Sequence, residues 1–64
     1  MKTQWKENLD KRMLIRKIYS RYPLEVRLIE ISTNGTWGKF HNMLSGNDFW
    51  EELENNVIVD ILPD

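Results

Sequence analysis

The dipeptide Asn34-Gly35 constrains the fold of this chain more than any other feature, because Asn-Gly is the strongest short signal for a two-residue hairpin turn. The preceding segment, residues 24–33, is rich in isoleucine, leucine and valine, which favours a β-strand. A two-residue turn also sets the register of a hairpin, and here it places Glu30 opposite Lys39. We therefore expect a β-hairpin with an opposite-charge pair on one of its faces.

The same turn places an apolar pair, Ile29 opposite Phe40, on the other face of the hairpin, and it also places Val26 opposite Met43. A rival interpretation makes residues 37–44 a helix, because Trp37, Phe40 and Leu44 have helical spacing. A glycine at position 38 and the Asn-Gly signal argue against that helix, so we prefer the strand.

Asn34-Gly35-Thr36 also matches the Asn-x-Thr acceptor pattern for N-glycosylation, which would require secretion. Residues 1–17 lack the apolar core of a signal peptide, and no apolar run approaches the length of a membrane span. We therefore expect a cytoplasmic protein and interpret the tripeptide as a turn.

Two further segments have helical patterns. In residues 8–20 an apolar stripe that includes Leu14 and Ile18 recurs at helical spacing, and Pro23 ends the pattern soon afterwards. In residues 45–56 a serine cap precedes apolar residues at helical spacing and glutamates that would face water. The last segment, residues 57–62, is a β-branched run that predicts a strand.

Together these elements predict an α+β fold, a two-layer α-β-β-α-β domain spanning residues 1–64. Its three-stranded antiparallel sheet would have the order 2-1-3, with both helices on one face. The strand of residues 24–33 would be central, because it carries apolar residues on both faces. The opposite face of the sheet would then be uncovered.

Composition excludes several kinds of site. The chain has no cysteine, so disulfides and cysteine-ligated zinc sites are excluded. It has one histidine and no glycine-rich phosphate loop, and no pattern indicates a catalytic triad, a cofactor or a metal. On the expected second helix, Asp48, Glu51 and Glu52 would share one side, where a solvated acidic face is a better interpretation than a cation site. We therefore expect a protein that is not an enzyme.

The uncovered sheet face indicates how such a protein could act. A chain of 64 residues with three tryptophans and two tyrosines is well supplied with the residues that anchor protein interfaces. The first hypothesis is a small non-enzymatic interaction module, an inhibitor or regulator of the bacterial or phage accessory type, that binds a protein partner. A homodimer, or shielding of the face by Trp5, remains open. The residues expected to bind are Leu28, Trp37, Lys39, His41 and Met43.

The alternative hypothesis is a nucleic-acid-binding regulator, since the chain carries opposite charges at its two ends. Residues 1–21 contain seven basic and two acidic residues, whereas residues 48–64 contain six acids and no base. The net charge of −1 argues against this hypothesis, because phosphate contacts dominate such binding. The expected contacts on the first helix are Lys11, Arg12, Arg16, Lys17 and Arg21.

Overall fold

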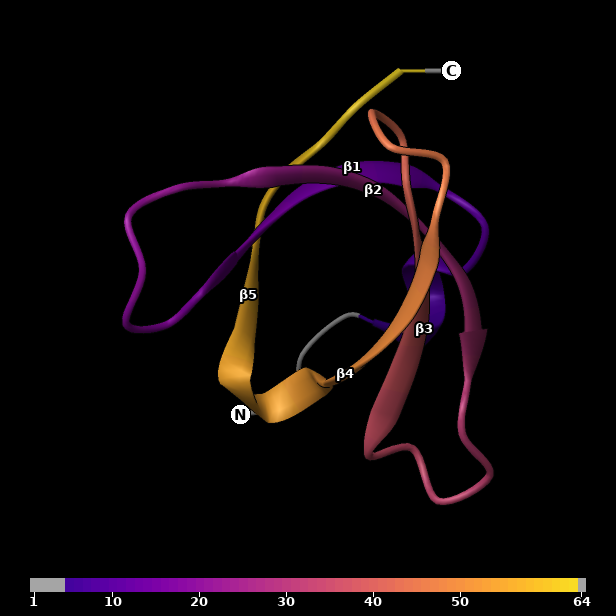
Figure 1. Cartoon of the computed structure of the whole chain (residues 1–64). Helices are drawn as coiled ribbons and strands as arrows, with labels where there is room; N and C mark the ends of the chain where they lie inside the picture. The colour runs from indigo at the N-terminus through magenta and orange to yellow at the C-terminus, as the bar shows by residue number, and fades with distance from the viewer. Residues whose placement is uncertain (1–4, 64) are drawn as a thin grey trace.

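The structure, a computed structural model, describes residues 5–63 and consists of one five-stranded antiparallel sheet with two short 3₁₀ turns (Figure 1). The turns are η1 (Lys6–Asn8) and η2 (Leu53–Asn55). The strands are β1 (Arg12–Lys17), β2 (Leu24–Ile31), β3 (Trp37–Asn42), β4 (Asp48–Glu52) and β5 (Asn56–Ile61). They pair in the order β4-β3-β2-β1-β5.

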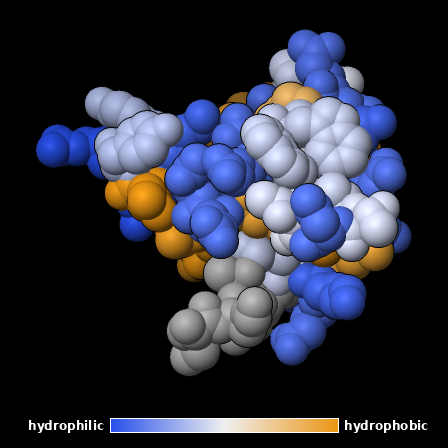
Figure 2. All heavy atoms as spheres, turned by 90° about the horizontal axis from the view of Figure 1, so that it is seen from below, coloured by the Kyte–Doolittle hydropathy of each residue, from blue (hydrophilic) through white to orange (hydrophobic). Residues whose placement is uncertain are grey.

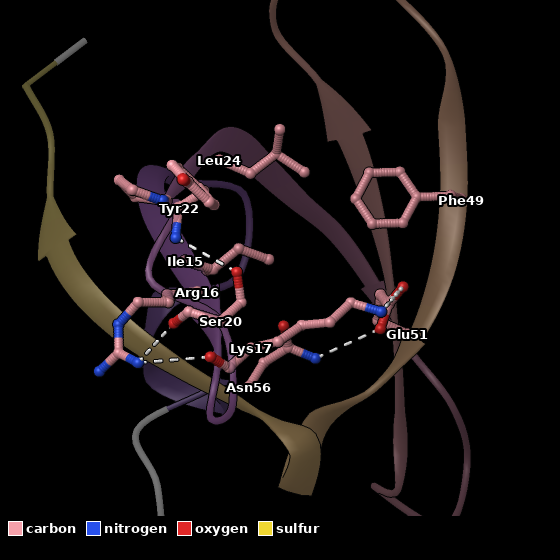
Figure 3. A pocket seen from close by; sticks show the side chains of 10 residues that line it. Ile15, Arg16, Lys17, Ser20, Tyr22, Leu24, Phe49, Glu51 and Asn56 are labelled. Carbon is pink, nitrogen blue, oxygen red and sulfur yellow. Dashed lines mark hydrogen bonds and ion pairs between the residues drawn. The ribbon is translucent and has the colours of Figure 1, made fainter.

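The sheet is strongly curved, so that its two edge strands, β4 and β5, face each other across the interior of the fold (Figures 1 and 3). Two register shifts accompany this bend. Ile29 is the extra residue of β2 in its pairing with β3, and Val59 is the extra residue of β5 in its pairing with β1. Such bulges increase the local twist and bend of a strand, which helps the sheet to curve around its core.

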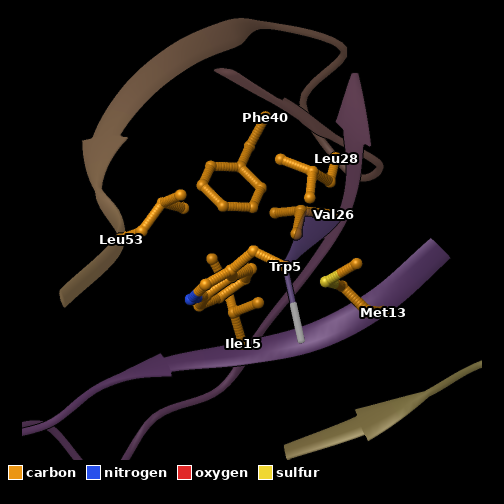
Figure 4. Packing of buried hydrophobic residues seen from close by; sticks show 7 residues of the cluster. All are labelled: Trp5, Met13, Ile15, Val26, Leu28, Phe40 and Leu53. Atoms are coloured by element: carbon orange, nitrogen blue, oxygen red, sulfur yellow. The ribbon is translucent and has the colours of Figure 1, made fainter. Parts of the chain in front are cut away.

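The core lies on the concave side of this sheet (Figure 4). Alternate residues of the strands point inward, as the pleat requires, and Trp5 covers them from the N-terminal side. Its indole packs edge-to-face on Phe40, with ring centroids 5.9 Å apart, and Phe40 in turn stacks on Phe49 at 5.7 Å. The buried cluster comprises Trp5, Met13, Ile15, Val26, Leu28, Phe40 and Leu53.

The helix predicted for residues 8–20 is wrong, because this segment contains β1 instead. Met13 and Ile15 are buried and their neighbours are not, which is the two-residue period of a strand. An isolated helix of this length is marginal in water, whereas β1 pairs with β2 on one side and β5 on the other. The apolar stripe that suggested a helix is exposed at Ile18.

The helix predicted for residues 45–56 is also wrong, since the segment forms β4, η2 and the first residue of β5. Phe49 points inward against Phe40, while Trp50 points to the other side of the sheet. The α+β class with a three-stranded sheet in the order 2-1-3 is therefore corrected to an all-antiparallel five-stranded sheet. The predicted last strand exists as β5, but it pairs with β1 rather than with β2.

The hairpin around Asn34-Gly35 is confirmed. The residues that follow it form a strand, as we preferred, and not the rival helix. Gly35 has a φ of 78°, a conformation that glycine adopts without the steric cost of a side chain. Glu30 lies opposite Lys39 as predicted. The bulge then shifts the register by one residue, so that Phe40 lies opposite residue 28 rather than residue 29. The strand β2 is central, as its apolar composition predicted.

Candidate protein-interaction surface

The convex side of β3 and β4 carries a group of exposed and partly exposed aromatic and charged side chains on one continuous part of the sheet. Because Gly38 and Phe40 face the core, the residues that alternate with them in β3 face outward, and the strand register brings three residues of β4 beside them. The cross-strand pairs are Trp37 with Glu52, Lys39 with Trp50, and His41 with Asp48. We call these six residues the outer face of the β3–β4 hairpin.

Two tryptophans dominate this outer face. Trp37 is 44% exposed and Trp50 is 45% exposed, so each indole presents nearly half of its surface to solvent. They lie diagonally across the two strands, with Lys39 next to Trp37 on the face and directly opposite Trp50. The face thus offers two rigid apolar surfaces separated by one cation, an arrangement in which a partner could bury rings and pair with the ammonium group.

One end of the outer face is held by a side-chain hydrogen bond. The Nδ1–H of His41 donates to the Oδ1 of Asp48 over 2.7 Å, and both side chains are partly exposed. Among the hydrogen bonds of residues 5–63, none joins a serine hydroxyl to the His41 ring, so the described residues contain no Ser-His-Asp arrangement around it. The pair restricts the orientation of both side chains across β3 and β4.

Of the residues predicted to bind, the structure brings Trp37, Lys39 and His41 together on the outer face. Leu28 is instead fully buried in the core, because the bulge in β2 turns it to the concave side. Met43 lies beyond the end of β3, is partly buried, and donates its backbone N–H to the carbonyl of residue 25.

Sequence reasoning missed Trp50, because the expected helix placed it on an inward face. No local pattern could have identified it, because Phe49 and Trp50 are adjacent aromatic residues that fit one face of a helix as well as the two faces of a strand. Because the segment is a strand and not a helix, its acids Asp48, Glu51 and Glu52 do not share one side. Asp48 and Glu52 lie on the outer face, whereas Glu51 points to the concave side and pairs with Lys17 at 3.4 Å.

The basic residues proposed for nucleic-acid binding do not lie on a helix. Arg12, Arg16 and Lys17 belong to β1, whereas Lys11 precedes it and Arg21 lies in the connection to β2. Arg12 forms an ion pair with an acid of β2 at 3.5 Å. The guanidinium of Arg16 donates to two backbone carbonyls, those of residues 17 and 20, at 3.3 and 2.9 Å. Several of these cations are thus engaged within the chain.

A pocket of about 220 Å³ opens between the edge strands β4 and β5 (Figure 3). Ile15, Leu24 and Phe49 give it apolar walls, and the connection between β1 and β2 borders it at Tyr22. The Lys17–Glu51 ion pair spans the opening, as the dashed line in Figure 3 shows. The pocket therefore has apolar walls and a charged rim.

On the face of the molecule that Figure 2 shows, hydrophobic side chains form small patches between hydrophilic ones. Within residues 5–63, no three histidine or acidic side chains come together in a way that could hold a metal ion. No helix in this part of the chain has the length and apolar character needed to cross a membrane.

Comparisons with known proteins add no relative: no protein family matches the chain, and no curated protein or solved structure matches it.

Proposed function

We propose that this chain is a small non-enzymatic protein-interaction module that acts as an inhibitor or regulator by covering a surface of a protein partner. The observation that carries this proposal is the pair of half-exposed tryptophans, Trp37 and Trp50, on one face of a short hairpin. Tryptophan is enriched among the residues that dominate binding energy, and its rigid ring loses little conformational entropy on binding. The outer face of the β3–β4 hairpin is the proposed contact.

The hairpin that carries these rings is well anchored. Phe40, between the outward-facing residues of β3, is fully buried, and β3 pairs along its length with both β2 and β4. A preorganised surface of this kind binds with a smaller ordering cost than a loop. We also propose that the protein acts in the cytoplasm, which is supported by a small chain without cysteine, since small secreted domains generally depend on disulfides.

The test is affinity capture with the purified full chain as bait, followed by mass spectrometry, in parallel for wild type and Trp37→Ala. Because Trp37 is exposed, we expect the variant to keep its thermal stability and lose capture of the specific partner. Ile18→Ala provides a matched control, since Ile18 is exposed in the connection between β1 and β2, away from the outer face. Equal capture by wild type and Trp37→Ala would show that this face is not the contact.

A nucleic-acid-binding regulator is the second candidate, favoured by the presence of Trp37, Lys39, His41 and Trp50 on one exposed face, where bases could stack. Two acids, at positions 48 and 52, share that face and oppose phosphate. Titration with a labelled single-stranded oligonucleotide at several salt concentrations decides between the candidates. Tight binding that weakens steeply with salt supports this one, and no binding at low salt removes it.

A further inference from the structure

The backbone of β4 has one side bonded to β3 and one side open. The N–H of Asn42 donates to the carbonyl of Asn47 at 2.8 Å, and the N–H of Leu53 donates to the carbonyl of Thr36 at 2.9 Å. In an antiparallel pair the bonded positions alternate along each strand, so the backbone groups of residues 49 and 51 also point to β3. Those of residues 48, 50 and 52 therefore point away from it.

No strand of residues 5–63 pairs with β4 on this outward side, because β4 ends the sheet. The carbonyl of Glu52 accepts a hydrogen bond from the Nδ2 of Asn56 at 3.0 Å, which occupies one outward group. The N–H and carbonyl of Trp50 and the N–H of Glu52 remain directed outward. We call this row of backbone groups the free edge of β4, and such a row is a template for a further strand.

The surroundings of the free edge determine which side chains a further strand would need. Phe49 and Glu51 line the pocket on the concave side of β4, so alternate side chains of an added strand would enter a space with apolar walls (Figure 3). The side chains between them would lie on the outer face beside Trp50. A residue directly opposite Trp50 would have Asp48 and Glu52 as its diagonal neighbours.

The charged residues around the free edge indicate which kind of strand could pair with it. After position 41 the chain contains no basic residue, and β4 with η2 contributes four acids. If two copies of this chain paired through their free edges about a two-fold axis at Trp50, Asp48 of each copy would lie opposite Glu52 of the other. Like charges directly opposite each other are destabilising, so the edge disfavours self-pairing and favours a basic strand.

We propose that the free edge of β4 binds an extended segment of a partner protein in which basic and apolar residues alternate. Its backbone continues the sheet, a lysine or arginine lies against the ring of Trp50 between the two acids, and flanking apolar side chains enter the pocket. This proposal rests on the proposed function, because it names the binding mode and the chemistry of the partner, but it uses the edge of β4 rather than Trp37.

The first experiment uses a six-residue peptide with blocked ends that alternates isoleucine and lysine, and as its control a peptide that alternates isoleucine and glutamate. Amide hydrogen exchange of the full chain, followed by NMR with saturating peptide, should slow at Trp50 and Glu52. It should stay unchanged at Phe49 and Glu51, whose amides are already bonded to β3. This alternation is the signature of a strand added at the edge.

The second experiment removes one outward N–H. Glu52 has a φ of −74°, which proline adopts, and its N–H points away from β3, so Glu52→Pro deletes a donor of the free edge while keeping the strand. Glu52→Gln is the matched control, because both variants lose the carboxylate. We expect Glu52→Pro to bind the isoleucine–lysine peptide about threefold to tenfold more weakly than Glu52→Gln, the effect of one hydrogen bond.

Several results would overturn the inference. One is equal binding of the acidic and basic peptides, and another is amide exchange that slows at Phe49 and Glu51 as much as at Trp50 and Glu52. The others are equal peptide affinity of the two Glu52 variants, and a dimer of this chain in which the two free edges pair with each other. Should Glu52→Pro fail to fold, the exchange pattern of the wild-type chain decides alone. Absence of peptide binding while capture still depends on Trp37 removes this inference only. Peptide binding at the edge while Trp37→Ala leaves capture unchanged removes outer-face docking only.

Discussion

Replacing Gly38 with alanine tests how closely β3 and η2 approach in the core. A methyl group at position 38 would lie 2.6 Å from the Cδ2 of Leu53, 3.2 Å from the Cδ1 of Leu28 and 3.3 Å from the Cε2 of Phe40. Leu53 is 4% exposed and the other two side chains are 0% exposed, so none of them can retreat into solvent. The extra methyl group must therefore push buried side chains apart.

The expected loss follows from this overpacking. Inserting a methylene group into a filled core costs about 1–3 kcal/mol, and the 2.6 Å contact places Gly38→Ala near the middle, at about 2 kcal/mol. For a domain of this size that corresponds to a decrease in the melting temperature of roughly 8–16 °C. If residues 37–44 were an exposed helix, the same substitution would raise stability by about 1 kcal/mol. The sign of the change therefore distinguishes the two structures.

Urea unfolding followed by tryptophan fluorescence measures this change. Leu53→Val in the Gly38→Ala background provides the control, because it removes the atom of the shortest contact. The double variant should lose less stability than the two single variants together, by more than about 0.5 kcal/mol. A midpoint for Gly38→Ala equal to or above that of the wild type would refute the close packing of β3 against η2.

Three further substitutions test other contacts. Gly35→Ala should lower the free energy of unfolding by about 1 kcal/mol, since φ is 78° there, while Gly35→Asn should lose less; equal losses in urea unfolding contradict this reason. Asn56→Ala should cost about 1–3 kcal/mol in thermal unfolding, because the carbonyl of Glu52 loses its donor; a change under 0.5 kcal/mol would mean that water replaces it. Lys17→Met should change stability by less than about 1 kcal/mol, because its ion pair with Glu51 is partly exposed, and a larger loss in urea would show a stronger pair.

Part of the candidate surface was predictable because side chains along a strand alternate between the two faces of the sheet. Once Gly35 reverses the chain, the sequence after it places Trp37, Lys39 and His41 on one face without information from distant residues. The position of Leu28 was not predictable in this way. One extra residue in β2 turns Leu28 to the core, and a bulge has no local sequence signal comparable to a turn dipeptide.

The acidic segment shows the opposite case. Ser45, Phe49, Trp50 and Leu53 satisfy the spacing of a capped helix as well as they satisfy a strand followed by a turn. The segment forms a strand because its backbone hydrogen-bonds to β3 along its length and the ring of Phe49 stacks on that of Phe40. Trp50 therefore lies on the outer face of the hairpin and not on the inward face of a helix.

The sequence by itself determined the hairpin at Asn34-Gly35 and the central place of β2, because turn chemistry and apolar composition act over neighbouring residues. Only the tertiary structure decided that residues 12–17 form a strand, since their partners lie far along the chain in β2 and β5. A short segment has similar free energies as helix and as strand when it is isolated. The backbone ladder and the burial of Met13 and Ile15 favour the strand once those partners are in place.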